Sequence, residues 1–340
     1  MGTEIRGVEG ARMVGRDAGA WDGMDYRAWQ DYEEVRRRLD AGADPERFGV
    51  GGSRPLHRAA AFGSPEVVAE LARRVPDVDA LENGTTALWD ALIAGRTENA
   101  RALAAAGADP EWTGHGGWTP ARLSLAGPEP ALFAQSGGPT PEGPPALTDA
   151  ELAVVVEGRR LITALGDFYY DGLGLACVAG IDAEEAIRRL EATPADEELM
   201  ASMVADPLDH DMDETLRFVG VTTVPGGCVL TQPWGYGPSM PGIHTRLSPG
   251  TVSYGLYANP KSGNQGSIHR DGVCEGWDLH PGGGPDVDDS PAEVLFSYVY
   301  CHHAVAYCLA HAGLRPTDPR AVLGPPDHWV ELPDRDYWTT

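Results

Sequence analysis

Apolar residues in the first part of the chain recur every three or four positions, in short segments that come in pairs. One pair covers residues 55–62 and 66–74, and a second covers residues 87–94 and 98–106. This spacing places the apolar side chains on one face of a helix. The pattern therefore predicts pairs of short amphipathic helices, with glycine between the members of a pair.

The helix pairs belong to an internal repeat. Residues 42–45 and 107–110 have the same sequence, Gly-Ala-Asp-Pro, 65 positions apart. The helix openings at residues 54–57, 86–89 and 119–122 follow one another at intervals of 32 and 33 residues. A repeat of this length is typical of stacked helical units that share one continuous core.

These motifs resemble the ankyrin repeat family, in which a Thr-Pro-Leu-His opening and a Gly-Ala-Asp close recur with this period. The resemblance covers residues 21–127 and implies an all-α ankyrin repeat solenoid, a scaffold that binds other proteins and has no chemistry of its own. His57 is then expected to bond between neighbouring turns. Trp89 stands where the family usually has His, which weakens the third turn but leaves the fold. Residues 1–20 are expected to form a flexible tail.

A Pro-rich linker is predicted at residues 128–147, followed by a second domain at residues 148–340. In this domain the period changes from helical to alternating near Leu216. Helices are predicted at residues 149–165, 183–190 and 291–313, and strands at 173–178, 217–224, 227–232, 251–258 and 266–278, the last with a hairpin turn at Asp271-Gly272. This order predicts an α+β domain with a mostly antiparallel sheet.

The second domain resembles an uncharacterised actinobacterial domain family that often follows ankyrin repeats. Residues 175–182, 246–248 and 270–272 carry this resemblance. No activity attaches to the family. An association with immunity or antidote proteins of bacterial conflict systems rests on analogy alone.

The charge balance restricts the partners of the chain. Asp and Glu number 51 against 26 Lys and Arg, which gives a formal net charge of −25. Such a protein lacks the basic face that nucleic-acid binding needs, so the sequence favours a basic protein partner and no nucleic acid.

The cysteines and the apolar segments indicate in which cellular compartment the protein is expected. Five cysteines without a C-x-x-C pair predict reduced thiols in the cytoplasm. The N-terminus has no apolar core of a secretory signal. Residues 294–314 carry no formal charge, but they include three histidines, and we interpret them as a buried helix rather than a membrane span.

Candidate binding residues lie near the loops that join the repeats, at residues 46–53, 78–84 and 111–117, which should form a row of fingertips. The aromatic side chains in or near this row are Phe48, Trp89, Trp112, His115 and Trp118. Exposed aromatic rings of this kind are typical anchors for a protein partner. The alternative is that they cap the stack or pack inside the molecule.

A second candidate recognition site is a Pro/Gly-rich loop between strands that contains Trp234, Tyr236 and His244. These residues could instead cover the sheet. No phosphate loop, nucleophile elbow or H-E-x-x-H occurs, so the sequence predicts no cofactor and no catalytic residue. Cys301, Cys308 and His311 lie on one predicted helix. The sequence shows no second cluster of metal ligands to complete a site, so no metal is predicted.

Two functions remain open. The first is a bacterial interaction module, an immunity, antidote or regulatory protein that binds a basic partner through its finger loops. The alternative is an enzyme of unknown reaction whose site lies in the α+β domain, near Trp234 and the acidic residues 209–214. The oligomeric state is left open.

Overall fold

The computed structural model describes residues 19–47, 54–133 and 146–339. Contacts divide the chain into two compact units, residues 1–146 and 147–340. Phe48 lies outside the described residues, as do most of the tail and most of the Pro-rich segment. None of the helices in the described ranges is both long and apolar enough to cross a bilayer.

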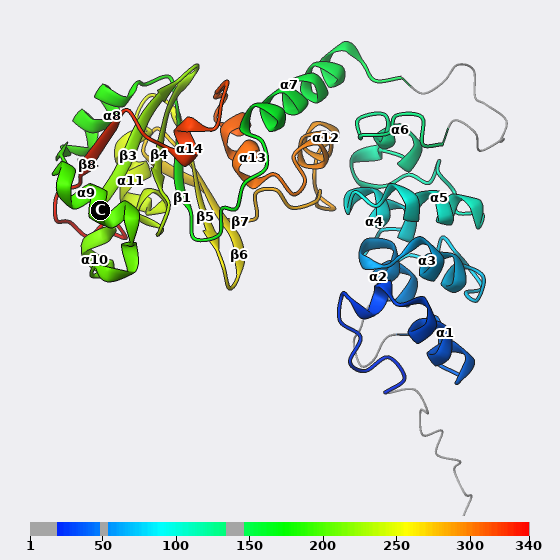
Figure 1. Cartoon of the computed structure of the whole chain (residues 1–340). Coiled ribbons are helices and arrows are strands. Elements are labelled where there is room, and N and C mark those ends of the chain that lie inside the picture. Colours follow the sequence, from blue (N-terminus) through cyan, green and yellow to red (C-terminus); the bar gives the residue numbers. More distant parts are fainter. Residues whose placement is uncertain (1–18, 48–53, 134–145, 340) are drawn as a thin grey trace, which may run out of the picture. The chain divides into compact units, whose positions relative to one another are not determined.

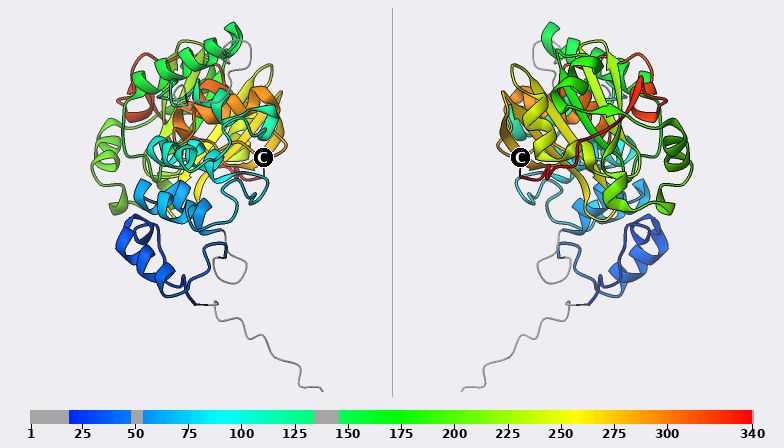
Figure 2. Two further views of the ribbon diagram at one scale, coloured as in Figure 1. Left: turned by 90° about the vertical axis from the view of Figure 1, so that its right-hand side faces the viewer. Right: turned by 90° about the vertical axis from the view of Figure 1, so that its left-hand side faces the viewer.

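The N-terminal unit consists of short helices that follow one another in sequence order (Figures 1 and 2). They are the 3₁₀ helices η1 (Ala28–Gln30) and η2 (His115–Gly117) and the α-helices α1 (Tyr32–Asp40), α2 (Pro55–Phe62), α3 (Pro65–Ala72), α4 (Ala87–Ile93), α5 (Thr97–Ala105) and α6 (Pro120–Ser124). The two predicted pairs are confirmed as α2–α3 and α4–α5. Helix α2 contacts α3 and α4, so adjacent repeats share one core.

Sequence-encoded caps and one buried amide fix these helices. The hydroxyls of Ser64, Thr86 and Thr119 each accept a hydrogen bond from the third residue of the helix that follows. Asn99, which is 2% exposed, donates from its amide nitrogen to the carbonyl oxygens of Ala59, Ala60 and Gly63. Helix α5 is thereby bonded to the end of α2, one repeat earlier.

The C-terminal unit is built on one eight-stranded antiparallel sheet with the order β2-β8-β3-β4-β1-β5-β6-β7. The strands are β1 (Gly174–Ala179), β2 (Thr193–Pro194), β3 (Phe218–Val224), β4 (Gly227–Gln232), β5 (Val252–Asn259), β6 (Gly263–Arg270), β7 (Val273–Leu279) and β8 (His328–Glu331). The antiparallel α+β architecture is therefore confirmed.

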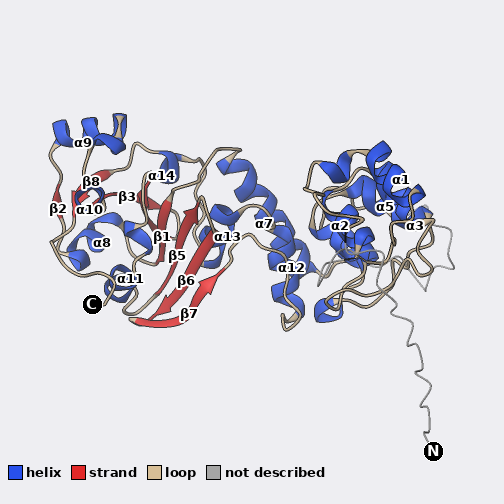
Figure 3. Ribbon diagram, turned by 90° about the horizontal axis from the view of Figure 1, so that it is seen from below, coloured by secondary structure: helices blue, strands red, loops and turns tan. Residues whose placement is uncertain are grey.

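Helices cover both faces of this sheet (Figure 3). One face packs against α7 (Asp149–Leu165), α12 (Pro291–Val299), α13 (Ala304–His311) and α14 (Arg320–Leu323), and the other against α8 (Ala183–Leu190) and α11 (Pro241–Leu247). Strand β1 shows the alternation that this arrangement requires, because Leu175 and Cys177 join the first core and Ala176 and Val178 the second. Helices α9 (Glu197–Ala205) and α10 (Met212–Thr215) and the 3₁₀ helices η3 (Pro207–Asp209) and η4 (Gly237–Ser239) complete the unit.

The helix caps and the hairpin turn that the sequence predicts in this unit are confirmed. Thr148 and Glu151 form the capping box of α7, and Asp182 caps α8. Asp271 and Gly272 have φ of 51° and 81°, as the type I′ turn of a hairpin requires, and they join β6 to β7.

Two sequence predictions in this unit are wrong. The helix at 291–313 is two helices, because the chain turns at His302, which has φ of 67° and donates its N–H to the Gly282 carbonyl. The loop proposed to carry His244 is partly helix α11, which begins with Pro241 at its first turn and buries Ile243 and Leu247 against the sheet.

Candidate functional site

The turns between the repeats are built on a recurring aspartate. The carboxylates of Asp44, Asp77 and Asp109 each accept a hydrogen bond from the backbone N–H two residues later, at 2.8, 3.0 and 2.9 Å. These residues are spaced by 33 and 32, so each repeat begins its turn with the same bond. Such a bond holds the turn without help from the rest of the chain.

The residue that donates each bond from its backbone N–H is itself acidic. The turns therefore carry six carboxylates, which we name the acidic edge: Asp44, Glu46, Asp77, Asp79, Asp109 and Glu111. Only Glu46 has a cationic partner among the described residues, the Arg54 guanidinium at 2.8 Å. The other five carboxylates form no ion pair within the described part of the chain, which makes this edge strongly negative.

Asp79 shows how closely these charges are placed. The Asp109 N–H donates to both Asp79 carboxylate oxygens, at 3.0 and 3.1 Å. Burial raises the pKa of Asp79, and the negative charges of Asp109 and Asp77 act in the same direction. A positive group placed beside Asp79 would relieve this repulsion.

His57 connects two repeats beneath this edge, as the sequence predicted. Its Nδ1 lies 2.7 Å from Asp90 Oδ2, and its Nε2 lies 2.9 Å from the Ala80 carbonyl oxygen. Burial lowers the pKa of His57, but the bonds to Asp90 and Ala80 outweigh it and raise the pKa above its ordinary value. The histidine is therefore a structural residue of the repeats.

The aromatic side chains of the finger loops pack on one another. Trp89 is 2% exposed; its ring centroid lies 6.1 Å from that of Trp112 and 5.4 Å from that of His115. Trp118 is fully buried, with the Arg122 guanidinium 4.2 Å above its ring. Trp89 and Trp118 thus offer a partner no surface, whereas Trp112 and His115 remain partly exposed. Phe48, the remaining candidate, lies outside the described residues.

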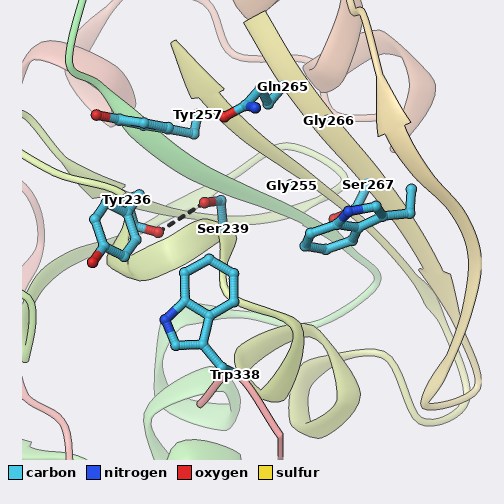
Figure 4. Close-up of a pocket in the computed structure, with 9 residues that line it drawn as sticks. Tyr236, Ser239, Gly255, Tyr257, Gln265, Gly266, Ser267 and Trp338 are labelled. Carbon is cyan, nitrogen blue, oxygen red and sulfur yellow. Dashed lines mark hydrogen bonds between the residues drawn. The ribbon is translucent and has the colours of Figure 1, made fainter. Parts of the chain in front are cut away.

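The C-terminal unit contains a pocket of about 290 Å³ on the α11 face of the sheet (Figure 4). Its residues come from η4 and the segment before it, from β5, β6 and β7, and from the C-terminal tail: Tyr236, Ser239, Gly255, Tyr257, Gln265, Gly266, Ser267, Trp277 and Trp338. We name it the aromatic pocket. No Asp, Glu, His, Lys, Arg or Cys lines it among the described residues.

Three neighbouring strands form the floor of the aromatic pocket. Gly255, Ser267 and Trp277 lie side by side on three neighbouring strands. A Cβ atom on Gly255 would lie 2.4 Å from His244 Nε2, so only glycine fits there. The Tyr236 ring lies 5.6 Å from Tyr257 and 5.7 Å from Trp338, measured between centroids.

The three residues of the second predicted site are separated by the fold. Tyr236 lines the aromatic pocket. His244 is fully buried behind the pocket floor, where its Nδ1 lies 2.9 Å from Ser253 Oγ and its ring stacks on His269 at 5.0 Å. Burial, with the neighbouring His269, lowers the pKa of His244 to about 3. Trp234 lies elsewhere and stacks on Trp329 at 5.7 Å.

Only part of these two sites can be recognised from the sequence. The acidic edge was visible as Asp-x-acid at the repeat interval, in residues 44–46, 77–79 and 109–111. In contrast, Trp277 and Trp338 come from a strand and a tail that only the fold brings to Tyr236. Cys177 and Cys308 are buried in the sheet core, and burial raises the pKa of each thiol.

Comparison with known proteins identifies the N-terminal part only. Residues 28–113 match the family model described as ankyrin repeats (3 copies). No curated protein matches the chain. The chain therefore carries ankyrin repeats in front of an antiparallel α+β unit, and repeats of this family indicate a protein–protein interaction module.

Proposed function

We propose that the ankyrin repeats bind a basic protein partner along the acidic edge, and that the chain acts in the cytoplasm as an immunity or regulatory protein that covers this partner. The observation that carries the proposal is the pair of carboxylates on each of three successive turns, of which only Glu46 is neutralised by an ion pair within the described residues. Because the turns recur at the repeat interval, the charges are regularly spaced on a preorganised surface. A partner with complementary positive charges can bind such a surface at a low entropic cost.

The turns do not need this charge. An Asn side chain makes the same hydrogen bond to the backbone two residues later, so a neutral residue would hold the turn equally well. The second acidic residue of each turn donates this bond from its backbone N–H, so its carboxylate has no part in it. Of these second carboxylates, that of Asp79 accepts a separate bond from the Asp109 N–H, which an Asn oxygen would also accept. Burial, together with the like charges of Asp109 and Asp77, raises the pKa of Asp79 and works against the folded state. A partner that supplies Lys or Arg explains why both positions are acidic.

The test removes the charge and keeps the turns. The variant Asp77→Asn, Asp79→Asn, Asp109→Asn, Glu111→Gln loses four negative charges and retains one acceptor oxygen in each side chain. The matched control, Glu184→Gln, Glu198→Gln, Asp288→Asn, Asp334→Asn, removes four exposed charges from the C-terminal unit. Both proteins, and the unaltered chain, are used as bait in the native host and the captured proteins are quantified by mass spectrometry.

We expect a Lys/Arg-rich protein to be captured by the unaltered chain and by the control, and its recovery to fall about tenfold or more with the edge variant. Equal recovery with the two variants would show that the acidic edge does not bind the partner. Loss with both would show that net charge alone attracts it.

A further inference from the structure

We propose that the aromatic pocket of the C-terminal unit binds a methylated ammonium group, either free, as in choline, or on a trimethylated lysine side chain. This inference is independent of the function proposed for the repeats, because every residue of the pocket belongs to the unit of residues 147–340.

Two tryptophan side chains that line the pocket are largely exposed. Trp277 and Trp338 are 53% and 52% exposed, whereas the tryptophans of the N-terminal core, Trp21 and Trp29, are 2% exposed. Both exposed rings line the same cavity as Tyr236 and Tyr257, and Figure 4 shows the labelled Tyr236, Tyr257 and Trp338 rings gathered around Ser239. Four rings from separate elements that face one small cavity indicate a ligand that contacts ring faces.

Two of the polar groups that line the pocket are engaged already. Ser239 Oγ donates to the Tyr236 carbonyl oxygen at 2.8 Å, and Gln265 Oε1 accepts from Asn259 Nδ2 at 3.4 Å. The pocket also offers the rings of Tyr236, Tyr257, Trp277 and Trp338, so the occupant that we infer is a group that contacts ring faces.

The electrostatics select a cation among such groups. The faces of Trp and Tyr rings carry the negative part of the ring quadrupole and attract a positive charge. No cationic side chain lines the pocket among the described residues, and the chain has a net charge of −25, which raises the local concentration of cations. Burial raises the pKa of Tyr257, so its ring stays uncharged and the phenol does not form an ion pair.

The absence of a lining carboxylate determines which cation fits. An unmethylated ammonium is strongly hydrated and has three N–H donors, and no carboxylate among the described lining residues would replace the water that it loses. Methylation removes those donors and spreads the charge over methyl groups that contact the rings. The pocket should therefore prefer a trimethylammonium group to the corresponding primary amine.

The test compares a cation with its uncharged isostere. Choline, a peptide with one trimethyllysine, the same peptide with unmodified lysine, and neutral 3,3-dimethylbutanol are titrated into the full chain and followed by tryptophan fluorescence and calorimetry. We expect saturable binding of at least one trimethylammonium probe, and binding about tenfold or more weaker for its uncharged or unmethylated counterpart. Tighter binding of the peptide assigns the group to a protein, and tighter binding of choline assigns it to a free molecule.

Trp338→Ala and Tyr236→Ala should each weaken binding about tenfold, and Trp338→Phe should weaken it less, because a Phe ring keeps a face for the cation. Tyr169→Ala is the control, since Tyr169 is 81% exposed and lies outside the pocket. If no trimethylammonium probe binds, or if choline and dimethylbutanol bind equally well, the proposal is wrong. Circular dichroism of each variant separates loss of binding from loss of fold.

Discussion

At the scale of single residues, His57 offers the clearest test of how the repeats are joined. The ring bonds Asp90 of the next repeat and the Ala80 carbonyl, and together they raise its pKa above the ordinary value of 6.5. Because the folded pKa exceeds the unfolded one, this protonation stabilises the N-terminal unit fully below about pH 6.5. The contribution is lost as the pH rises through the folded pKa. We expect an NMR titration of the His57 ring to give a pKa above 6.5.

Asp90→Asn supplies the control for this prediction. Asn keeps a side chain of the same shape and removes the negative charge, so the His57 pKa should fall, while burial, which lowers it, remains. The stability of the variant should then depend less on pH between about 6 and 8 than that of the unaltered chain. An unchanged His57 pKa in Asp90→Asn would mean that the ion pair does not form in solution.

The same scale shows where sequence reasoning reached its limit. The role of His57 as a link between neighbouring turns followed from the repeat motif, whereas its partners Asp90 and Ala80 came from the structure. The burial of Trp89 and Trp118 did not follow from the motif, since position in a loop region says little about which neighbours cover a ring. Both tryptophans lie near the finger row that was interpreted as a surface, and packing of His115 and Arg122 on them was not foreseeable from spacing.

At the scale of elements, Asn99 joins α5 to α2. We therefore expect its replacement to lower the stability of the N-terminal unit measurably. Asn99→Ala removes three hydrogen bonds to carbonyl oxygens at a site that is 2% exposed. We expect the unfolding free energy of the N-terminal unit to fall by about 1–3 kcal/mol. Asn99→Asp should lower it further, because a carboxylate would face three carbonyl oxygens without a donor. Urea denaturation monitored by circular dichroism at 222 nm measures both.

Glu98→Gln serves as the matched control for this prediction, since residue 98 is the exposed neighbour of Asn99 on the same helix and loses only a surface ion pair with Arg101, which contributes little to stability. Its unfolding midpoint should match that of the unaltered chain. If Asn99→Asp proves as stable as Asn99→Ala, the amide donor does not contribute as the geometry indicates.

Elements whose ends carry a local signal were predictable, and elements shaped by distant contacts were not. The capping box of α7 and the Asp271-Gly272 hairpin are encoded within four residues, and both are found where expected. The break between α12 and α13 has no Gly or Pro to mark it. It arises because His302 bonds the Gly282 carbonyl, and an added Cβ on Gly282 would lie 2.7 Å from the Ala304 nitrogen. Only the fold brings those segments together.

At the scale of the whole molecule, the excess of carboxylates affects both association and stability. With 51 acidic and 26 basic side chains, one-to-one pairing still leaves a net charge of −25. Many surface ion pairs join residues three or four positions apart, such as Glu185 with Arg188 and Arg189. Exposed pairs of this kind contribute little to the free energy of folding. The long-range repulsion among the remaining charges therefore dominates the electrostatic free energy of the folded chain.

This excess predicts that salt stabilises the fold. Sodium chloride screens the repulsion over a Debye length of about 10 Å at 0.1 M and about 3 Å at 1 M. We expect the urea midpoint at pH 7 to rise between low salt and about 0.5 M salt. The urea midpoint of the variant that neutralises Asp77, Asp79, Asp109 and Glu111 should rise less, because this variant has lost part of the repulsion that salt screens. Salt should have the opposite effect on the binding of a basic partner, which should weaken over the same range of salt concentration. A midpoint that falls with added salt would mean that local ion pairs outweigh the net charge, and the acidic edge would then cost the fold nothing.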